Sequence, residues 1–297
     1  LNTTGSANTV MGHNSFDANT TGGANVAIGA QSLSSNTSAD NNTAVGSFCL
    51  RDNTTGTNNT GLGRGVMILN TTGQQNVAVG SFALDAATTA DNNTAIGHGA
   101  LGATTTGAMN TALGGDVLLN NTTGQRNTGL GQNSLNANTT ASNNVAVGAS
   151  ALAVNTTGSE NVAIGTFALD SNTTAVGNVA VGYASLEVNT TGNENVAVGS
   201  FALDANTTAR FNTAVGQMAL SANTTAEANT GIGRTSLFAN TTGASNTGCG
   251  CATLENNTTG GSNNAFGHHC LDANTTGDFN CGFGVHSLGS NTTADNN

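Results

Sequence analysis

The chain has 297 residues and a formal net charge of −11, yet only 7% of its residues are charged and 4% are aromatic. Nucleic-acid binding draws on clustered Lys and Arg that displace counterions from phosphates, and five scattered Arg cannot supply such a cluster. No apolar run approaches the ~20 residues of a membrane-spanning helix, so we expect no membrane span. Val, Ile and Leu recur at regular places, which argues against disorder.

A glycine in the motif Asn-x-x-x-Gly recurs every 17 residues, without insertion or deletion, and Asn297 begins a further unit. These glycines are Gly12, Gly29, Gly46, Gly63, Gly80, Gly97, Gly114, Gly131, Gly148, Gly165, Gly182, Gly199, Gly216, Gly233, Gly250, Gly267 and Gly284. The consensus reads N-[TV]-[AG]-[VIL]-G-x-x-[AS]-L-x-x-N-T-T-[GA]-x-x. We therefore interpret residues 1–297 as one continuous repeat array, a segment of a longer fibre without separate domains.

Seventeen residues are too few for a helix pair, whose repeat is ~34 residues long. They suit one coil of two short strands and two turns, in which each coil hydrogen-bonds to the next at ~4.8 Å. The sequence thus predicts an all-β fold, a parallel β-solenoid of about 17 coils with a strict 17-residue repeat.

Positions in the unit are numbered from its Asn, so that a strand is expected around positions 2 to 4. Position 4 is always apolar, position 2 is mostly Thr or Val, and position 9 is Leu in fifteen units, with Phe16 and Met67 as exceptions. Because side chains two apart on a strand share a face, we expect positions 2, 4 and 9 to form the dry interior. Gly at position 5 and Gly or Ala at position 15 mark tight corners, and the variable positions 6, 7, 10, 11, 16 and 17 should face solvent.

Position 3 is Ala or Gly in every unit except the first, which has Val10. Its side chain should point away from position 4, and a water-facing column would accept a larger polar residue somewhere. Either a neighbouring chain or the opposite wall of a very thin coil therefore approaches this column closely. The first alternative makes the position 3 alanines interface candidates, among them Ala146, Ala163, Ala180 and Ala197.

Two Asn columns complete the unit. Position 1 is Asn throughout, and position 12 is Asn except where Ala87 and Thr104 occur. Stacked identical amides can form hydrogen-bonded ladders, and Asn tolerates left-handed turn conformations. The residues expected to define the coil are exemplified by Asn161, Gly165, Leu169, Asn172, Asn195, Gly199, Leu203 and Asn206.

Runs such as Asn161-Val162-Ala163-Ile164-Gly165 and 195–199 resemble repeats in tail-fibre-like proteins of phages and bacteria. They are also similar to the N-S-V-A-I-G repeat in the heads of YadA-type trimeric autotransporter adhesins, which is shorter and lacks the Asn-Thr-Thr segment. The resemblance covers essentially the whole chain. It implies a left-handed parallel β-roll and three chains side by side, hence a homotrimer or another self-assembled filament.

No catalytic constellation emerges, so we expect no enzyme and no cofactor. The acidic residues lie mostly at corner positions, as in Asp17, Asp85, Asp170, Asp204 and Asp272 at position 10, and are interpreted as solvated corners. Stacked carboxylates could bind Ca²⁺, but the glycine-aspartate nonapeptide of calcium β-rolls is absent.

Three further features are weighed in the same way. His268, His269 and His286 are weak metal-ligand candidates, and His269 and His286 should lie roughly 5 Å apart on adjacent coils. The five Cys are interpreted as free thiols rather than a disulfide framework. Each Asn-Thr-Thr matches the N-glycosylation acceptor pattern, but a laddered turn explains its repetition equally.

The function that these features favour is a structural shaft or head segment of a surface fibre. It would act as a spacer and an adhesive display surface for a cell-surface or glycan receptor, on a cell-surface appendage or a virion outside the cell. The alternative is an ice- or glycan-binding β-solenoid that uses its Thr and Asn columns.

Overall fold

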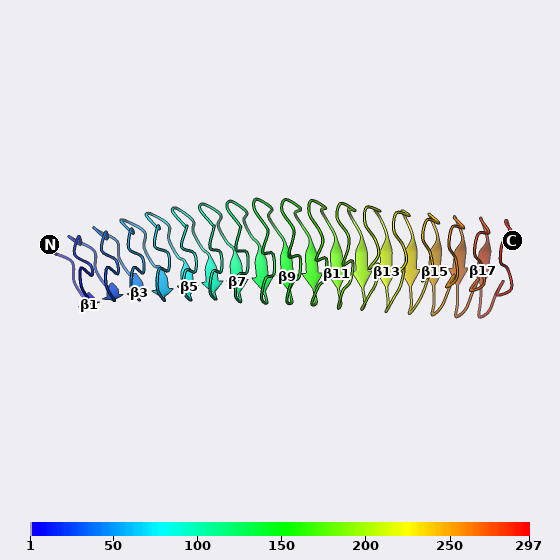
Figure 1. Cartoon of the computed structure of the whole chain (residues 1–297), viewed down its shortest axis with the longest axis horizontal. Coiled ribbons are helices and arrows are strands. Elements are labelled where there is room, and N and C mark those ends of the chain that lie inside the picture. Colours follow the sequence, from blue (N-terminus) through cyan, green and yellow to red (C-terminus); the bar gives the residue numbers. More distant parts are fainter. Residues whose placement is uncertain (1) are drawn as a thin grey trace. The chain divides into compact units, whose positions relative to one another are not determined.

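The computed structural model describes residues 2–297 and divides into two compact units, residues 2–144 and 145–297. Each is a stack of similar coils with one short strand per coil (Figure 1). The strands of the first unit are β1 (Thr9–Met11), β2 (Val26–Ile28), β3 (Thr43–Val45), β4 (Thr60–Leu62), β5 (Val77–Val79), β6 (Thr94–Ile96), β7 (Thr111–Leu113) and β8 (Thr128–Leu130). Those of the second are β9 (Val145–Val147), β10 (Val162–Ile164), β11 (Val179–Val181), β12 (Val196–Val198), β13 (Thr213–Val215), β14 (Thr230–Ile232), β15 (Thr247–Cys249), β16 (Asn264–Phe266) and β17 (Cys281–Phe283).

Within each unit every strand pairs in parallel with the next one along the chain. The register advances by one repeat, as in Val162↔Val179 and Ala163↔Ala180. The predicted parallel β-solenoid with a 17-residue repeat is therefore confirmed. No helix occurs in residues 2–297, and so none that is long and apolar enough to span a bilayer.

The prediction of two strands per coil is wrong, because each coil has only one. Positions 7 and 9 adopt left-handed backbone conformations, for example Phe167 at φ 59° and Leu169 at φ 54°. Such residues cannot continue an extended strand, and they turn the chain sharply through the second half of the coil. The glycine corner at position 5 is confirmed, since Gly165 has φ 135°.

The inside–outside assignment of the strand is the reverse of the expected one. In β2 to β17 the middle residue, at position 3, is buried, while positions 2 and 4 are half-buried or exposed. Position 9 lies in the interior as predicted, and Leu169 and Leu203 are fully buried. The expectation that positions 2 and 4 belong to the dry interior is therefore wrong.

The coil is so thin that its two walls touch. A Cβ atom added at Gly248, at position 3, would meet the side chains of Ser236, Thr253 and Leu237, at positions 8 and 9 of the opposite wall. Position 3 is small because this wall leaves no room. The interface candidates Ala146, Ala163, Ala180 and Ala197 are all 0% exposed within their own chain. They do not face a neighbouring chain, and the alternative of a thin coil is the right one.

Both predicted Asn ladders are present, and their members are buried except in the coils at the two ends of the chain. At position 1, the backbone N–H of Asn195 donates to Oδ1 of Asn178 at 2.9 Å, and the Asn195 amide donates to the carbonyl of Ala209 at 2.9 Å. At position 12, Nδ2 of Asn206 donates to Oδ1 of Asn189 at 2.8 Å. These bonds satisfy amides that would otherwise destabilise the interior, and they link each coil to the next.

The second ladder is interrupted in the first unit, where position 12 holds Ala87 and Thr104. As a result, Oδ1 of Asn70 is buried without a hydrogen bond. Ladder bonding resumes where Nδ2 of Asn121 donates to Oγ1 of Thr104 at 3.3 Å. The repeat thus tolerates a local gap in one ladder while the other continues past it, as between Asn76 and Asn93.

Candidate binding surfaces

The outward side of each parallel sheet is uncharged, with apolar side chains at position 4 and mostly Thr or Val at position 2. It is formed by positions 2 and 4 and is called the sheet face below. No coil carries a charged residue at either position. Ile164 and Ile232 are 40% and 41% exposed, although they would be buried in an ordinary core. A repeated apolar face of this kind is typical of a surface that another protein covers.

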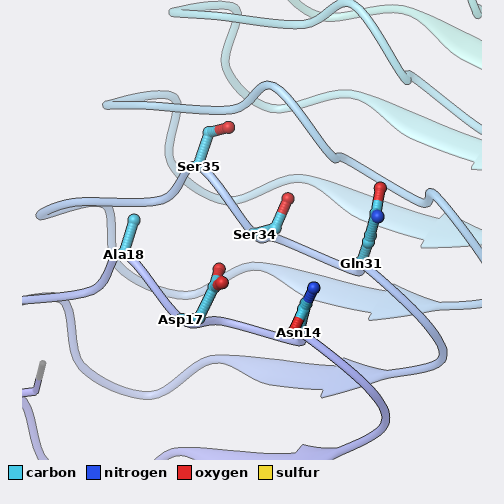
Figure 2. A pocket seen from close by; sticks show the side chains of 6 residues that line it. All are labelled: Asn14, Asp17, Ala18, Gln31, Ser34 and Ser35. Atoms are coloured by element: carbon cyan, nitrogen blue, oxygen red, sulfur yellow. The ribbon is translucent and has the colours of Figure 1, made fainter.

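A different corner of the coil is hollowed, between position 7 on one side and positions 10 and 11 on the other. Figure 2 shows a shallow hollow in the first unit, with side chains from two successive coils standing along its floor. They belong to Asn14, Asp17, Ala18, Gln31, Ser34 and Ser35. These positions vary from coil to coil, so the chemistry of this corner varies while the backbone repeats.

A second hollow at the same corner contains an aromatic ring and acidic groups. Its lining includes Phe82, Asp85, His98 and Asp116, together with the small residues Gly99, Gly102 and Ala103. Nδ1 of His98 lies 3.6 Å from Oδ1 of Asp116.

Most of the position 10 carboxylates are not the fully solvated corners that we expected, and three of them have a shifted pKa. Asp85, Asp170 and Asp204 are half-buried. Desolvation raises the pKa of each above its ordinary value, and the nearby charge of Glu187 adds to the rise in the pKa of Asp170. Each ends the sequence Phe-Ala-Leu-Asp, and the recurrence of this tetrapeptide in one register is a signal present in the sequence itself.

The histidines are brought together as expected. The rings of His269 and His286 stack with their centroids 5.2 Å apart, and His268 lies 4.2 Å from His269. Nδ1 of His269 is 3.1 Å from Oδ2 of Asp272. Among residues 2–297, however, no group of three or more His, Cys, Asp or Glu has a geometry that could hold a metal ion.

The Asn-Thr-Thr segments do not offer their Asn for glycosylation in the folded chain. Asn172 is 0% exposed, and its Nδ2 donates to Oδ1 of Asn155 at 2.8 Å. Thr173, at position 13, donates its hydroxyl to the carbonyl of Thr190 at 3.2 Å. The next residue, at position 14, is exposed in every described coil and is Thr everywhere except Ser38.

The five cysteines are free and fall into three environments. Cys49 and Cys270, at position 8, are buried as expected, and burial raises the pKa of the Cys49 thiol to about 12. Cys249 and Cys281, which were expected inside the coil, lie on the sheet face instead. Cys251 is half-buried at position 6.

Neither a protein-family model nor a curated protein matches this chain.

Proposed function

We propose that the chain is a structural shaft segment of an extracellular fibre, on a cell-surface appendage or a virion, in which copies associate through their sheet faces. It is a spacer and display surface for a cell-surface or glycan receptor, and not an enzyme. The observation that carries this proposal is the uncharged, partly exposed sheet face, which recurs in every coil of both units.

Burial of this face supplies the driving force for association. Val, Ile and Leu side chains at positions 2 and 4 leave apolar area in contact with water, and its removal stabilises a complex by roughly 25 cal/mol per Å². Because all copies share the same 17-residue period, a contact made by one coil can be repeated by each of the remaining coils. A partner without this period would match the face at few places, so another copy of the chain is the best fit.

Three copies about a common axis bring all their sheet faces together and close the assembly, in keeping with the closed symmetry of most homo-oligomers. The resemblance to trimeric adhesin heads supports the same number. The corner with positions 7, 10 and 11 then faces outward, where its variable side chains can meet a receptor. The Asn ladders keep these side chains at fixed intervals.

The proposal predicts that charges on the sheet face dissociate the assembly. The chain of 29.1 kDa should sediment as a particle of three times that mass, and the double variant Ile164→Glu/Ile232→Glu should sediment as a single chain. The carboxylates reach water in the monomer because both positions are about 40% exposed, but they would be buried without partners in the assembly.

The matched control is Val154→Glu/Val188→Glu, which adds the same charges at position 11. Val154 and Val188 are 43% and 39% exposed, so the two pairs start from similar environments. The control should keep the mass of the unsubstituted protein. A single-chain mass for the unsubstituted protein, or equal dissociation of both double variants, would refute association through the sheet face.

A further inference from the structure

The tetrapeptide Phe-Ala-Leu-Asp occurs at residues 82–85, 167–170 and 201–204, each time at positions 7 to 10. Its Ala and Leu are buried in the coil, whereas the rings of Phe82 and Phe167 are each 37% exposed. Ring and carboxylate are thus held on the same outer corner by a buried Ala-Leu pair. Each copy of the tetrapeptide therefore repeats the same surface pair, Phe and Asp, as well as the same buried pair, Ala and Leu.

Folding alone does not explain phenylalanine at this position. Phe167 and Phe201 have φ values of 59° and 56°, in the left-handed region. Asn and Gly adopt that region more readily than a bulky residue, and Asn133 and Gly99 occupy the same position in other coils. Because Phe82 and Phe167 also stay partly exposed, and Phe201 is half-buried, their presence points to a role on the surface.

In the second unit two of these rings flank the chain's single tyrosine. The Tyr183 ring lies 6.1 Å from that of Phe167 and 5.3 Å from that of Phe201, both edge to face. Tyr183 is 48% exposed. The three rings form a continuous aromatic cluster over three successive coils.

A row of carboxylates accompanies this cluster. Asp170, Glu187 and Asp204 occupy position 10 of the same three coils, so neighbouring members are about one coil spacing, ~4.8 Å, apart. Asp204 accepts a hydrogen bond from Oγ of Ser221 at 2.6 Å, but in the part of the chain that the structure describes none of the three forms an ion pair. The desolvation and mutual repulsion noted above mark a negative surface that lacks its counter-charge.

In the first unit, one ring of this motif is in contact with a cation. The guanidinium of Arg64 lies over the ring of Phe82, 5.3 Å from its centroid, next to the hollow that contains Asp85. In the second unit the equivalent residues that precede Phe167 and Phe201 by one coil are Ala149 and Tyr183, so no arginine covers these rings from that position. An internal cation fills one example of the motif, whereas the equivalent place is left open by Ala149 at Phe167 and is taken by the Tyr183 ring at Phe201.

We propose that the side chains of Phe167, Tyr183, Phe201, Asp170, Glu187 and Asp204, called the aromatic–acidic ledge, bind a linear polyamine. Ammonium groups are attracted to aromatic faces within about 6 Å and form charge-assisted hydrogen bonds with carboxylates. Amines separated by three methylene groups, as in the two end segments of spermine, lie about 5 Å apart over four single bonds of about 1.5 Å, which matches the coil spacing. Side chains on one face of an extended basic peptide lie ~6.6 Å apart and do not match it.

The test uses spermine as the probe and the fluorescence of Tyr183 as the signal, since the chain has one Tyr and no Trp. Spermine should produce a saturable change with one site per chain. The double variant Asp170→Asn/Glu187→Gln should bind at least tenfold more weakly. The control Glu160→Gln/Glu194→Gln removes two negative charges from position 17, at another corner of the same unit, and should bind as the unsubstituted chain does.

A second pair of substitutions separates binding from structure. Phe167→Asn/Phe201→Asn should lower spermine affinity at least threefold while Tm is maintained or raised, because Asn suits the left-handed backbone better. Reduced Tm would assign the rings to folding and overturn the proposal. So would equal weakening in the Glu160/Glu194 control, or tighter binding of oligolysine or of a neutral linear oligosaccharide than of spermine. The ledge consists of residues at positions 6, 7 and 10 and includes none of the sheet-face residues at positions 2 and 4.

Discussion

Replacement of Ala163 by glutamate is expected to unfold the coil that contains it. Ala163 is fully buried at position 3, and the opposite wall leaves no space at this position, as the surroundings of Gly248 show. An ion moved from water into such an interior costs several kcal/mol when no partner compensates its charge. The melting temperature of Ala163→Glu, measured by circular dichroism, should therefore fall steeply, or the variant should not fold at all.

The control for this experiment is Ala149→Glu, the same substitution at an exposed position 6 of the neighbouring coil. It should melt like the unsubstituted chain. If Ala163→Glu instead kept its melting temperature and only reduced the mass of the particle, position 3 would face a neighbouring chain after all. The reversed inside–outside assignment of the strand would then be untenable.

Truncation of Leu203 should have the next largest effect. Leu203 is 0% exposed at position 9, the main aliphatic column of the interior. Removal of comparable buried leucines costs about 2–5 kcal/mol through lost transfer free energy and the cavity that remains. Denaturant unfolding of Leu203→Ala should show a lower free energy of unfolding by this amount.

Val188→Ala provides the comparison within the same unit, since Val188 is 39% exposed at position 11. Its free energy of unfolding should change by less than about 1 kcal/mol, because little buried area is lost. Similar losses in Leu203→Ala and Val188→Ala would show that position 9 is no more interior than position 11.

The coil could be predicted from the sequence because the 17-residue repeat is unbroken. The unbroken spacing of Gly165 and its equivalents required a solenoid, and the invariant Asn at position 1 indicated the ladder that Asn178 and Asn195 form. The two faces of the strand could also be separated, because Val162 and Ile164 alternate with Ala163. Which face is buried could not be derived from that alternation, because apolar residues fit both an interior and an interface.

The thickness of the coil determines which face of the strand is buried. This thickness depends on backbone conformations that cannot be predicted from the residue types. Leu169 and Phe167 are not residue types that favour the left-handed region, yet the backbone of both is left-handed. The resulting turns bring position 9 directly against position 3, which excludes a wider coil with positions 2 and 4 inside. The second strand that we expected is absent for the same reason.

The candidate sites were predicted in part. The spacing of His269 and His286 follows from the register, as does the stacking of the position 10 acids. The burial of Asp170 and Asp204 was missed because each position was considered as a separate column. Tyr183, at position 6, contacts Phe167 and Phe201, at position 7 of the two adjacent coils. This contact between different positions depends on the three-dimensional course of the coil.

The native cysteines offer the most direct test of the central claim, that the repeat buries position 3 and leaves positions 2 and 4 free to contact another copy. Mass spectrometry would follow alkylation of each thiol at pH 8 in the assembled chain and in Ile164→Glu/Ile232→Glu. Thiolates react and neutral thiols do not, so Cys49, whose pKa burial raises to about 12, and the buried Cys270 should stay unmodified in both. Cys251 should react in both.

The thiols of Cys249 and Cys281 lie on the sheet face, so their reactivity tests whether another copy covers this face. The account predicts that they react slowly in the assembled chain and become reactive in the dissociated variant. Equal and rapid modification of Cys249, Cys281 and Cys251 in the unsubstituted chain would contradict it, because the sheet face would then be open to solvent.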